Sequence, residues 1–76
     1  MPTLYHTDGC HLCEQAMQLL TQCNVDYQLV DIVFDEHLVA LFGTRIPVLT
    51  CNQGKQLNWP FDVQQIQQFL SPNKSE

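Results

Sequence analysis

The chain has 76 residues, 45% of them hydrophobic and 14% charged, so we expect one small domain spanning residues 1–76. Three basic and eight acidic residues give a net charge of −5, which disfavours nucleic acids and anionic membranes as partners. No apolar run approaches the roughly 18 residues of a membrane span, and the amino-terminal residues lack the pattern of a secretory signal. We therefore expect a cytoplasmic protein, monomeric, with no membrane or nucleic-acid partner.

Four cysteines are many for so short a chain, and they stand at Cys10, Cys13, Cys23 and Cys51. An even count is compatible with a secreted scaffold held by two disulfides. The missing signal and the apolar periodicity described next argue against that scaffold. A redox pair or a metal site then remains.

The first half of the chain predicts a strand, a helix and a second strand. Residues 3–6 are a short β-prone run stopped by the turn pair Asp8-Gly9. Residues 11–23 place their apolar positions on one face of a helix, and Asn24 suits the left-handed residue that ends it. These apolar positions are Leu12, Ala16, Leu19, Leu20 and Cys23. Residues 27–34 are mostly apolar and β-branched, which predicts a strand buried on both faces.

The middle of the chain predicts a short helix followed by a hairpin. Asp35 is expected to cap the helix, and Gly43 is expected to end it. The side chains expected to face inward are Leu38, Leu41 and Phe42. Residues 46–51 predict a strand, residues 52–54 a turn, and residues 55–59 the returning strand.

The last element is expected to be a helix that begins near Asp62 and ends at Ser71-Pro72. Asp62 and Gln65 have the spacing of a capping box, in which each side chain bonds the other's backbone N–H. The buried face comprises Val63, Ile66, Phe69 and Leu70. The element order is therefore β-α-β-α-β-β-α.

This order predicts an α/β fold with a mixed four-stranded sheet and helices on both faces. Strands that alternate with helices favour parallel pairing, and the hairpin adds an antiparallel pair. Right-handed crossovers place the first and last helices on one face of the sheet and the middle helix on the other.

Cys10 and Cys13 lie where the first helix begins, and this position favours a redox-active, nucleophilic cysteine. The unsatisfied N–H groups and positive dipole end of a helix N-terminus favour a thiolate over a thiol. One helical turn separates the two residues, which is short enough for a disulfide. We expect Cys10 to be open and to attack, and Cys13 to be shielded and to resolve. Closing so small a ring removes only about 2 kcal/mol of unfolded-state entropy, so the reduced form should also fold.

Two other interpretations of the cysteines stay open. Zinc or an iron–sulfur centre between two chains would need further ligands, for which His6 and His11 are candidates, but the chain has no second CxxC. Our main prediction therefore assigns no metal. Cys23 and Cys51 are expected to be small buried hydrophobes. His6 is expected to be a strand residue, and His37 to face solvent.

Three stretches carry a family resemblance: YHTDGCHLCE at residues 5–14, RIPVL at 45–49, and WPFD at 59–62. With the element order, they resemble the glutaredoxin branch of the thioredoxin superfamily, and most closely its small bacterial glutaredoxin-like proteins, over nearly the whole chain. The resemblance implies a thioredoxin-like fold in which Cys10 is the nucleophile and Cys13 the resolving thiol. It also implies a cis Pro47 against this pair, with the Ile46 backbone offered to an extended substrate.

The chain departs from typical glutaredoxins at the positions that hold glutathione. It has His11 and Leu12 where they have Pro-Tyr, and no lysine precedes the motif. Residues 58–61 replace a Gly-Gly pair, and Pro60 removes an N–H donor. Asp8 adds a repulsive charge, whereas Arg45 can still receive a carboxylate. Glutathione is therefore expected at most as a co-substrate, and no bound cofactor is expected.

These observations favour a glutaredoxin-like thiol–disulfide oxidoreductase that acts through a mixed disulfide. Its partner would be a protein disulfide or a low-molecular-weight thiol. His11 and Asp8 are expected to tune the pair, because a protonated imidazole favours a thiolate and a carboxylate disfavours it. Arg45 and Trp59 are candidate substrate contacts, although Trp59 and Phe61 also suit packing at the sheet edge. The alternative to an enzyme is a non-catalytic interaction module with the same fold.

Overall fold

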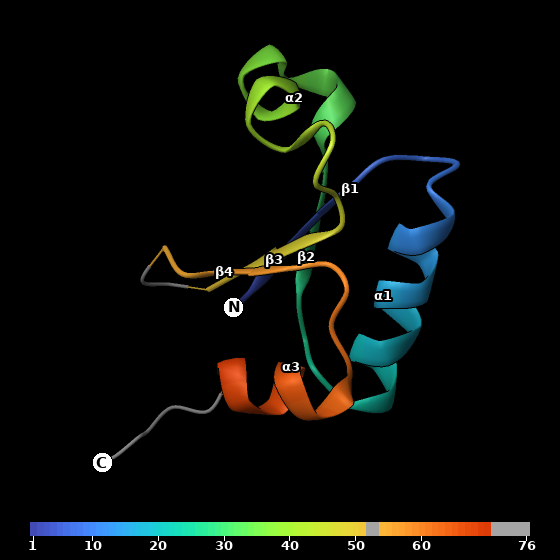
Figure 1. Ribbon diagram of the computed structural model, residues 1–76, viewed down its shortest axis with the longest axis vertical. Helices are drawn as coiled ribbons and strands as arrows, with labels where there is room; N and C mark the ends of the chain where they lie inside the picture. The colour runs from blue at the N-terminus through green and yellow to red at the C-terminus, as the bar shows by residue number, and fades with distance from the viewer. Residues whose placement is uncertain (52–53, 71–76) are drawn as a thin grey trace.

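The computed structural model describes residues 1–51 and 54–70. The predicted order of elements is confirmed, with one short 3-10 helix added. The elements are β1 (Thr3–His6), α1 (His11–Gln22), β2 (Gln28–Asp31), η1 (Ile32–Phe34), α2 (Glu36–Phe42), β3 (Val48–Thr50), β4 (Gln56–Asn58) and α3 (Val63–Leu70). Figure 1 shows the strands between α2 on one side and α3 on the other.

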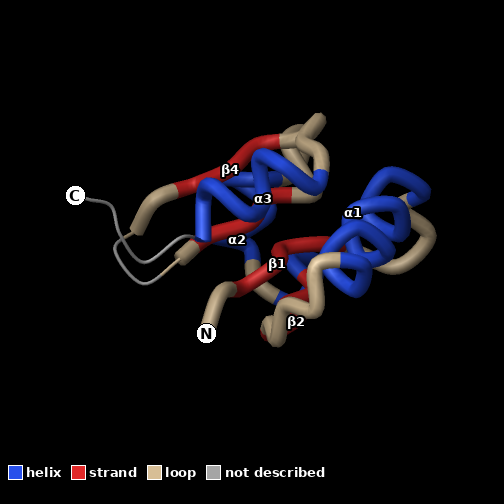
Figure 2. Tube along the Cα trace, turned by 90° about the horizontal axis from the view of Figure 1, so that it is seen from below, coloured by secondary structure: helices blue, strands red, loops and turns tan. Residues whose placement is uncertain are grey.

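The four strands form one mixed sheet in the order β2-β1-β3-β4. β1 pairs with β2 in parallel, as expected when α1 connects them, and β3 pairs antiparallel with both β1 and β4. Figure 2 shows β4 at one edge of this sheet and β2 at the other. β1 and β3 are therefore the central strands, and both lead towards the segments of the candidate site.

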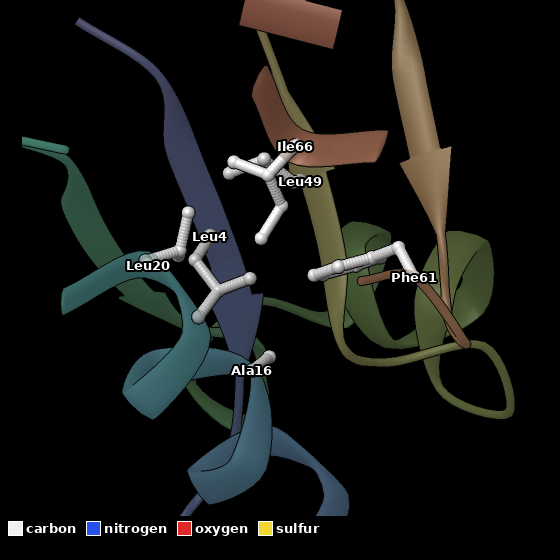
Figure 3. Packing of buried hydrophobic residues seen from close by; sticks show 6 residues of the cluster. All are labelled: Leu4, Ala16, Leu20, Leu49, Phe61 and Ile66. Atoms are coloured by element: carbon white, nitrogen blue, oxygen red, sulfur yellow. The ribbon is translucent and has the colours of Figure 1, made fainter. Parts of the chain in front are cut away.

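The main core lies between the sheet and the two helices α1 and α3, as predicted for the first and last helices (Figure 3). Its buried members are Leu4, Ala16, Leu20, Leu49, Phe61 and Ile66. A fully buried aliphatic side chain contributes about 1.5–3 kcal/mol. This side of the sheet therefore provides most of the stability of so small a domain.

A smaller cluster lies on the opposite face, under α2. Ile32, Phe42 and Val48 are buried there, and the ring of Tyr5 stacks on that of Phe42 with centroids 4.7 Å apart. Successive strand residues alternate between the two faces. Leu4 thus enters the main core while the neighbouring Tyr5 enters the α2 cluster.

The prediction of a long strand at 27–34, buried on both faces, is wrong. β2 ends at Asp31, and the Asp31 carboxylate accepts the N–H of Val33 over 3.0 Å, which turns the chain into η1. β2 is also an edge strand, so nothing in the sheet covers its outer side. Phe34, the last residue of η1, is 87% exposed despite its apolar character.

Two helix residues expected to face inward are exposed. Leu12 on α1 is 44% exposed and Leu41 on α2 is 57% exposed. α1 buries Cys13, Ala16 and Leu20 on one stripe of its surface, and Leu12 lies at the border of this stripe. α2 has only seven residues and turns Phe42 inward, which leaves Leu41 towards solvent.

 The helix ends agree with the capping residues that the sequence predicts. Asn24 has a φ of 58° after α1, and the Asp35 carboxylate accepts the N–H groups of His37 and Leu38 at the start of α2. Asp62 and Gln65 form the expected capping box, with bonds of 3.0 and 2.8 Å. These local bonds fix where α2 and α3 begin.

Two predicted turns are described only in part. Gly54 has a φ of 77° and donates its N–H to the Cys51 carbonyl, consistent with the expected hairpin turn. Residues 52–53 of that turn, and the helix stop at Ser71-Pro72, lie outside the described residues. Within the described part of the chain, no helix has the length and apolar character needed to cross a bilayer.

Candidate redox site

The loop after β1 places Cys10 at the start of α1. Gly9 has a φ of 78°, and the Cys10 N–H donates to the Thr7 carbonyl over 3.3 Å. The left-handed backbone at Gly9 favours glycine, so the sharp turn from strand to helix depends on this residue. Cys10 is then the N-cap of α1, with extended backbone angles.

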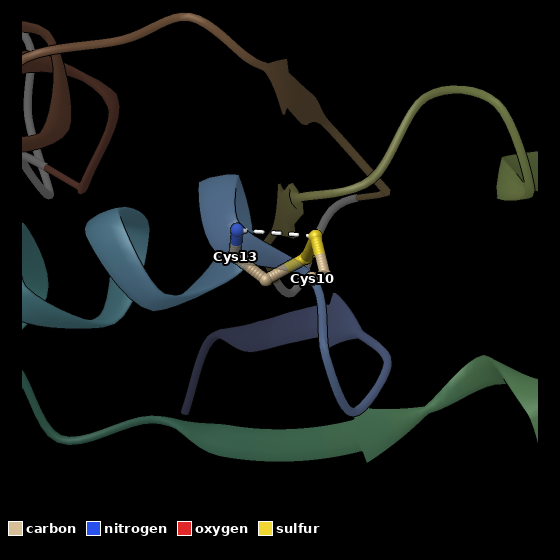
Figure 4. Close-up of a disulfide and its surroundings, with 2 residues drawn as sticks. All are labelled: Cys10 and Cys13. Carbon is tan, nitrogen blue, oxygen red and sulfur yellow. Dashed lines mark hydrogen bonds between the residues drawn. A yellow bond between two sulfur atoms is a disulfide. The ribbon is translucent and has the colours of Figure 1, made fainter.

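Cys10 and Cys13 form a disulfide across the first turn of α1, with their Cα atoms 5.2 Å apart (Figure 4). The Cys10 Sγ also accepts the backbone N–H of Cys13 over 3.2 Å. Cys10 is partly exposed, whereas Cys13 is completely buried. The two sulfurs therefore differ in access as the sequence predicts, and Cys10 is the one that an outside thiol or disulfide can reach.

Pro47 is the proline that the family resemblance places against this pair. The Ile46–Pro47 bond is cis, which the resemblance implies, and Pro47 is fully buried directly before β3. β3 pairs with β1 so that Val48 faces Tyr5, and Pro47 therefore comes next to the end of β1 that leads to Cys10. A second cis bond, at Trp59–Pro60, has no counterpart in the sequence prediction.

Arg45 is held against the outer strand of the sheet. One guanidinium nitrogen donates to the side-chain oxygens of Gln56 and Asn58, over 2.9 and 3.0 Å, and the guanidinium carbon lies 5.7 Å from the centre of the Phe42 ring. Two nitrogens of the exposed guanidinium have no described protein bond in this arrangement. Arg45 is thus positioned two residues before Pro47 with donors left for a carboxylate.

Comparison with known proteins agrees with this geometry. A family model described as a glutaredoxin-like domain (DUF836) matches residues 3–71. The chain belongs to this glutaredoxin-like family. The thioredoxin-like fold that the sequence predicts is therefore confirmed, together with the family resemblance.

Solved structures agree with this family and fold. The glutaredoxin-like chain is 37% identical to protein XcR50 from X. campestris, whose X-ray structure superposes with a TM-score of 0.89 over 97% of this chain and 100% of the other. Protein Ne2328 from Nitrosomonas europaea is 32% identical, with a TM-score of 0.72 over 92% of this chain and 89% of the other. A search of curated proteins found none that matches.

Trp59 and Phe61 pack in this glutaredoxin-like domain rather than project from it. Their rings meet edge to face with centroids 5.0 Å apart, Phe61 is buried in the main core, and Trp59 is partly buried against it. This is the packing role that the sequence suggests as one option. Trp59 as a substrate contact stays a prediction, because part of its side chain is still accessible.

The remaining candidate residues lie around the pair or away from it. Asp8 and His11 are exposed on either side of Cys10, as their tuning role requires, and that role stays a prediction.

Cys23 is partly buried against the main core, with its Sγ 3.9 Å from the Val63 carbonyl, and Cys51 is partly buried at the end of β3. His37 faces solvent as expected. Within residues 1–51 and 54–70, no three His, Cys, Asp or Glu residues gather as a metal site would require.

His6 is the residue whose environment the sequence prediction missed. Its Nδ1, at the end of β1, is buried and has no hydrogen-bond partner among the residues that the structure describes. The sequence shows His6 as one member of a short strand. The sequence did contain a signal for this burial. Residues two apart on a strand face the same side of the sheet, so His6 faces the same side as the buried Leu4.

Proposed function

We propose that this glutaredoxin-like domain is a thiol–disulfide oxidoreductase whose redox centre is Cys10 and Cys13. The observation that carries the proposal is the disulfide at the start of α1, with one partly exposed and one buried sulfur. A purely structural disulfide would stabilise the fold little here, because it closes a ring of only four residues and contributes only about 2 kcal/mol in the loop-closure model.

The first step starts from the reduced pair. The Cys10 thiolate attacks one sulfur of a substrate disulfide, a bond forms between Cys10 and that sulfur, and the other substrate sulfur leaves as a thiolate that takes a proton. The N–H of Cys13 and the positive end of α1 favour the thiolate form of Cys10. Its partial exposure provides the access that the attack requires.

The second step uses the buried cysteine. Cys13 loses its proton, and its sulfur attacks the Cys10 sulfur of the mixed disulfide. The bond between Cys10 and the substrate breaks, and the substrate leaves as a thiol after taking a proton. Two electrons and two protons have then passed from the protein to the substrate disulfide, and an outside thiol or dithiol must restore the reduced pair.

The substrate class is a disulfide in an extended protein segment or in a small molecule. Ile46, before Pro47, has a backbone that suits pairing with an extended segment, as in strand addition. Glutathione fits less well, because Asp8 is exposed near Cys10 and Pro60 lacks an N–H. Arg45 is the group that favours a substrate carboxylate.

The test is the reduction of insulin and of 2-hydroxyethyl disulfide, with dithiothreitol as the reductant. Cys10→Ser should abolish turnover, and Cys13→Ser should accumulate the mixed disulfide, which mass spectrometry detects. The matched control is a variant with both Cys23→Ser and Cys51→Ser, which should keep its activity. Activity that persists in Cys10→Ser, or a wild-type protein that is inactive with both substrates, would contradict the proposal.

A further inference from the structure

The imidazole of His6 contains an unusual buried atom. Within residues 1–51 and 54–70, its Nδ1 is the one buried side-chain nitrogen or oxygen that has no hydrogen-bond partner. Leaving such an atom unpaired costs about 1–3 kcal/mol. A buried unpaired atom in a native fold calls for an explanation, and a role in proton transfer is one of the physical explanations available.

The pleat of β1 determines which way His6 faces. Leu4 packs in the main core with residues of α1, and Tyr5 stacks on Phe42 in the α2 cluster on the opposite face. His6 follows Leu4 by two residues and therefore lies on the α1 side of the sheet. The helix that begins with the redox pair covers this side.

The position of His6 along β1 brings it level with Cys13. Leu4 belongs to one buried cluster with Leu20 and Ala16, and Figure 3 shows these two residues on α1 beside β1. His6 is about 6.6 Å further along the strand. This distance corresponds to about four residues of a helix that runs the opposite way, and four residues before the middle of Ala16–Leu20 is the turn that contains Cys13.

Few other ionisable groups face this position. From β2, Asp31 is the register neighbour of His6, and one of its carboxylate oxygens accepts the Val33 N–H over 3.0 Å. β3 contributes apolar residues next to the end of β1, namely Pro47 and Val48. The first turn of α1 contributes the two cysteines and also His11 and Glu14, whose side chains are exposed.

We propose that His6 Nδ1 accepts the proton of the Cys13 thiol during the second step of the reaction, an inference that depends on the proposed function. The proton passes from Cys13 Sγ to Nδ1, the new Cys13 thiolate attacks Cys10 Sγ, and the bond from Cys10 to the substrate breaks. The departing substrate thiolate then takes a proton from the imidazolium. A thiol buried in apolar surroundings ionises poorly by itself, so a nearby proton acceptor would speed this step.

The experiment follows the two steps separately with 5,5′-dithiobis(2-nitrobenzoate). Reduced protein with Cys23→Ser and Cys51→Ser is mixed with an equal amount of this reagent in a stopped-flow instrument. Attack by Cys10 releases one coloured thiolate, and resolution by Cys13 releases a second. A free thiol is only a few per cent ionised at neutral pH, so H6Q should slow the second release by about tenfold at pH 7 and leave the first unchanged.

The pH dependence separates proton transfer from a structural role. Raising the pH to 9 increases the thiolate fraction of Cys13 independently of His6, so the difference between H6Q and the wild type in the rate of the second release should narrow. H6N, which preserves a nitrogen or oxygen near the place of Nδ1 but accepts no proton, should behave like H6Q. H37Q, on the exposed face of α2, is the matched control and should match the wild type.

Three results would overturn the proposal. The second release could be unchanged in H6Q and H6N at pH 7, or it could be slowed equally at pH 7 and pH 9, which indicates a structural effect. The third result is a protein with His6 intact in which no release depends on Cys10. This result would contradict the proposed function, and the role of His6 would fall with it. In the Cys23→Ser, Cys51→Ser background, two releases with His6 present and one release after Cys13→Ser would support the two exchange steps of the proposed function independently of His6.

Discussion

Cys10 caps the helix that contains its own disulfide partner, because the backbone N–H of Cys13 donates to the Cys10 Sγ over 3.2 Å. The first N–H groups of a helix have no partner within the helix. One sulfur thus meets a structural need of α1 and forms the accessible half of the redox pair. In the reduced protein the same N–H is available to a Cys10 thiolate.

The capping bond predicts different stabilities for two substitutions of Cys10. Under reducing conditions, Cys10→Ala should have a free energy of unfolding about 1 kcal/mol below that of Cys10→Ser, because a serine oxygen can accept the Cys13 N–H and a methyl group cannot. Urea unfolding followed by circular dichroism measures the difference. The same pair of substitutions at Cys51, which caps no helix, is the control. Equal stabilities of the two Cys10 variants would show that the bond contributes nothing.

The charge of Asp8 is expected to oppose glutathione. Asp8 is exposed two residues before Cys10, and two unit charges about 7 Å apart in water interact by roughly 0.6 kcal/mol. Asp8→Lys reverses the sign of this interaction, a change of about 1.2 kcal/mol, and should raise kcat/KM for oxidised glutathione by up to about sevenfold. The neutral 2-hydroxyethyl disulfide should be reduced at an unchanged rate. Asp26→Lys, in the loop after α1, is the control, and an equal gain in that variant would attribute the effect to net charge.

Residues that act through local bonds could be predicted from the sequence. The carboxylate of Asp35 bonds N–H groups two and three residues away, and Asp62 and Gln65 bond each other across one helical turn. Such bonds depend on spacing alone, so the pattern is sufficient. The different access of Cys10 and Cys13 followed in the same way from the face of α1 on which Cys13 lies.

Features that depend on the arrangement of whole elements could not be predicted. Residues 27–34 have the composition of a buried strand, yet β2 lies at the edge of the sheet and η1 turns away after Asp31. The unpaired Nδ1 of His6 depends on which side of β1 the helix α1 covers. Neither the strand order nor this packing is encoded in local spacing.

Exposure predicts opposite outcomes at two phenylalanines of neighbouring elements. Phe42 is buried and stacks on Tyr5, whereas Phe34 is 87% exposed. Phe42→Leu should lower the free energy of unfolding by about 1–2 kcal/mol, because it loses the aromatic stack and some packing. Phe34→Leu should stay within about 0.5 kcal/mol of the wild type. Thermal and urea unfolding test both, and a large loss in the Phe34 variant would mean that Phe34 is covered in solution.

Arg45 is expected to select substrates that carry a carboxylate. Its guanidinium is held by Gln56 and Asn58 on β4, so it does not need to be ordered when a substrate arrives. Arg45→Gln should lower kcat/KM for oxidised glutathione by about threefold to tenfold, the loss of a charged hydrogen bond at an exposed site. Reduction of 2-hydroxyethyl disulfide should not change, because this substrate has no carboxylate. Lys55→Gln removes another exposed cation, directly before β4, and is the control. An equal loss with both substrates would assign Arg45 to the structure of the 43–47 segment and not to substrate selection.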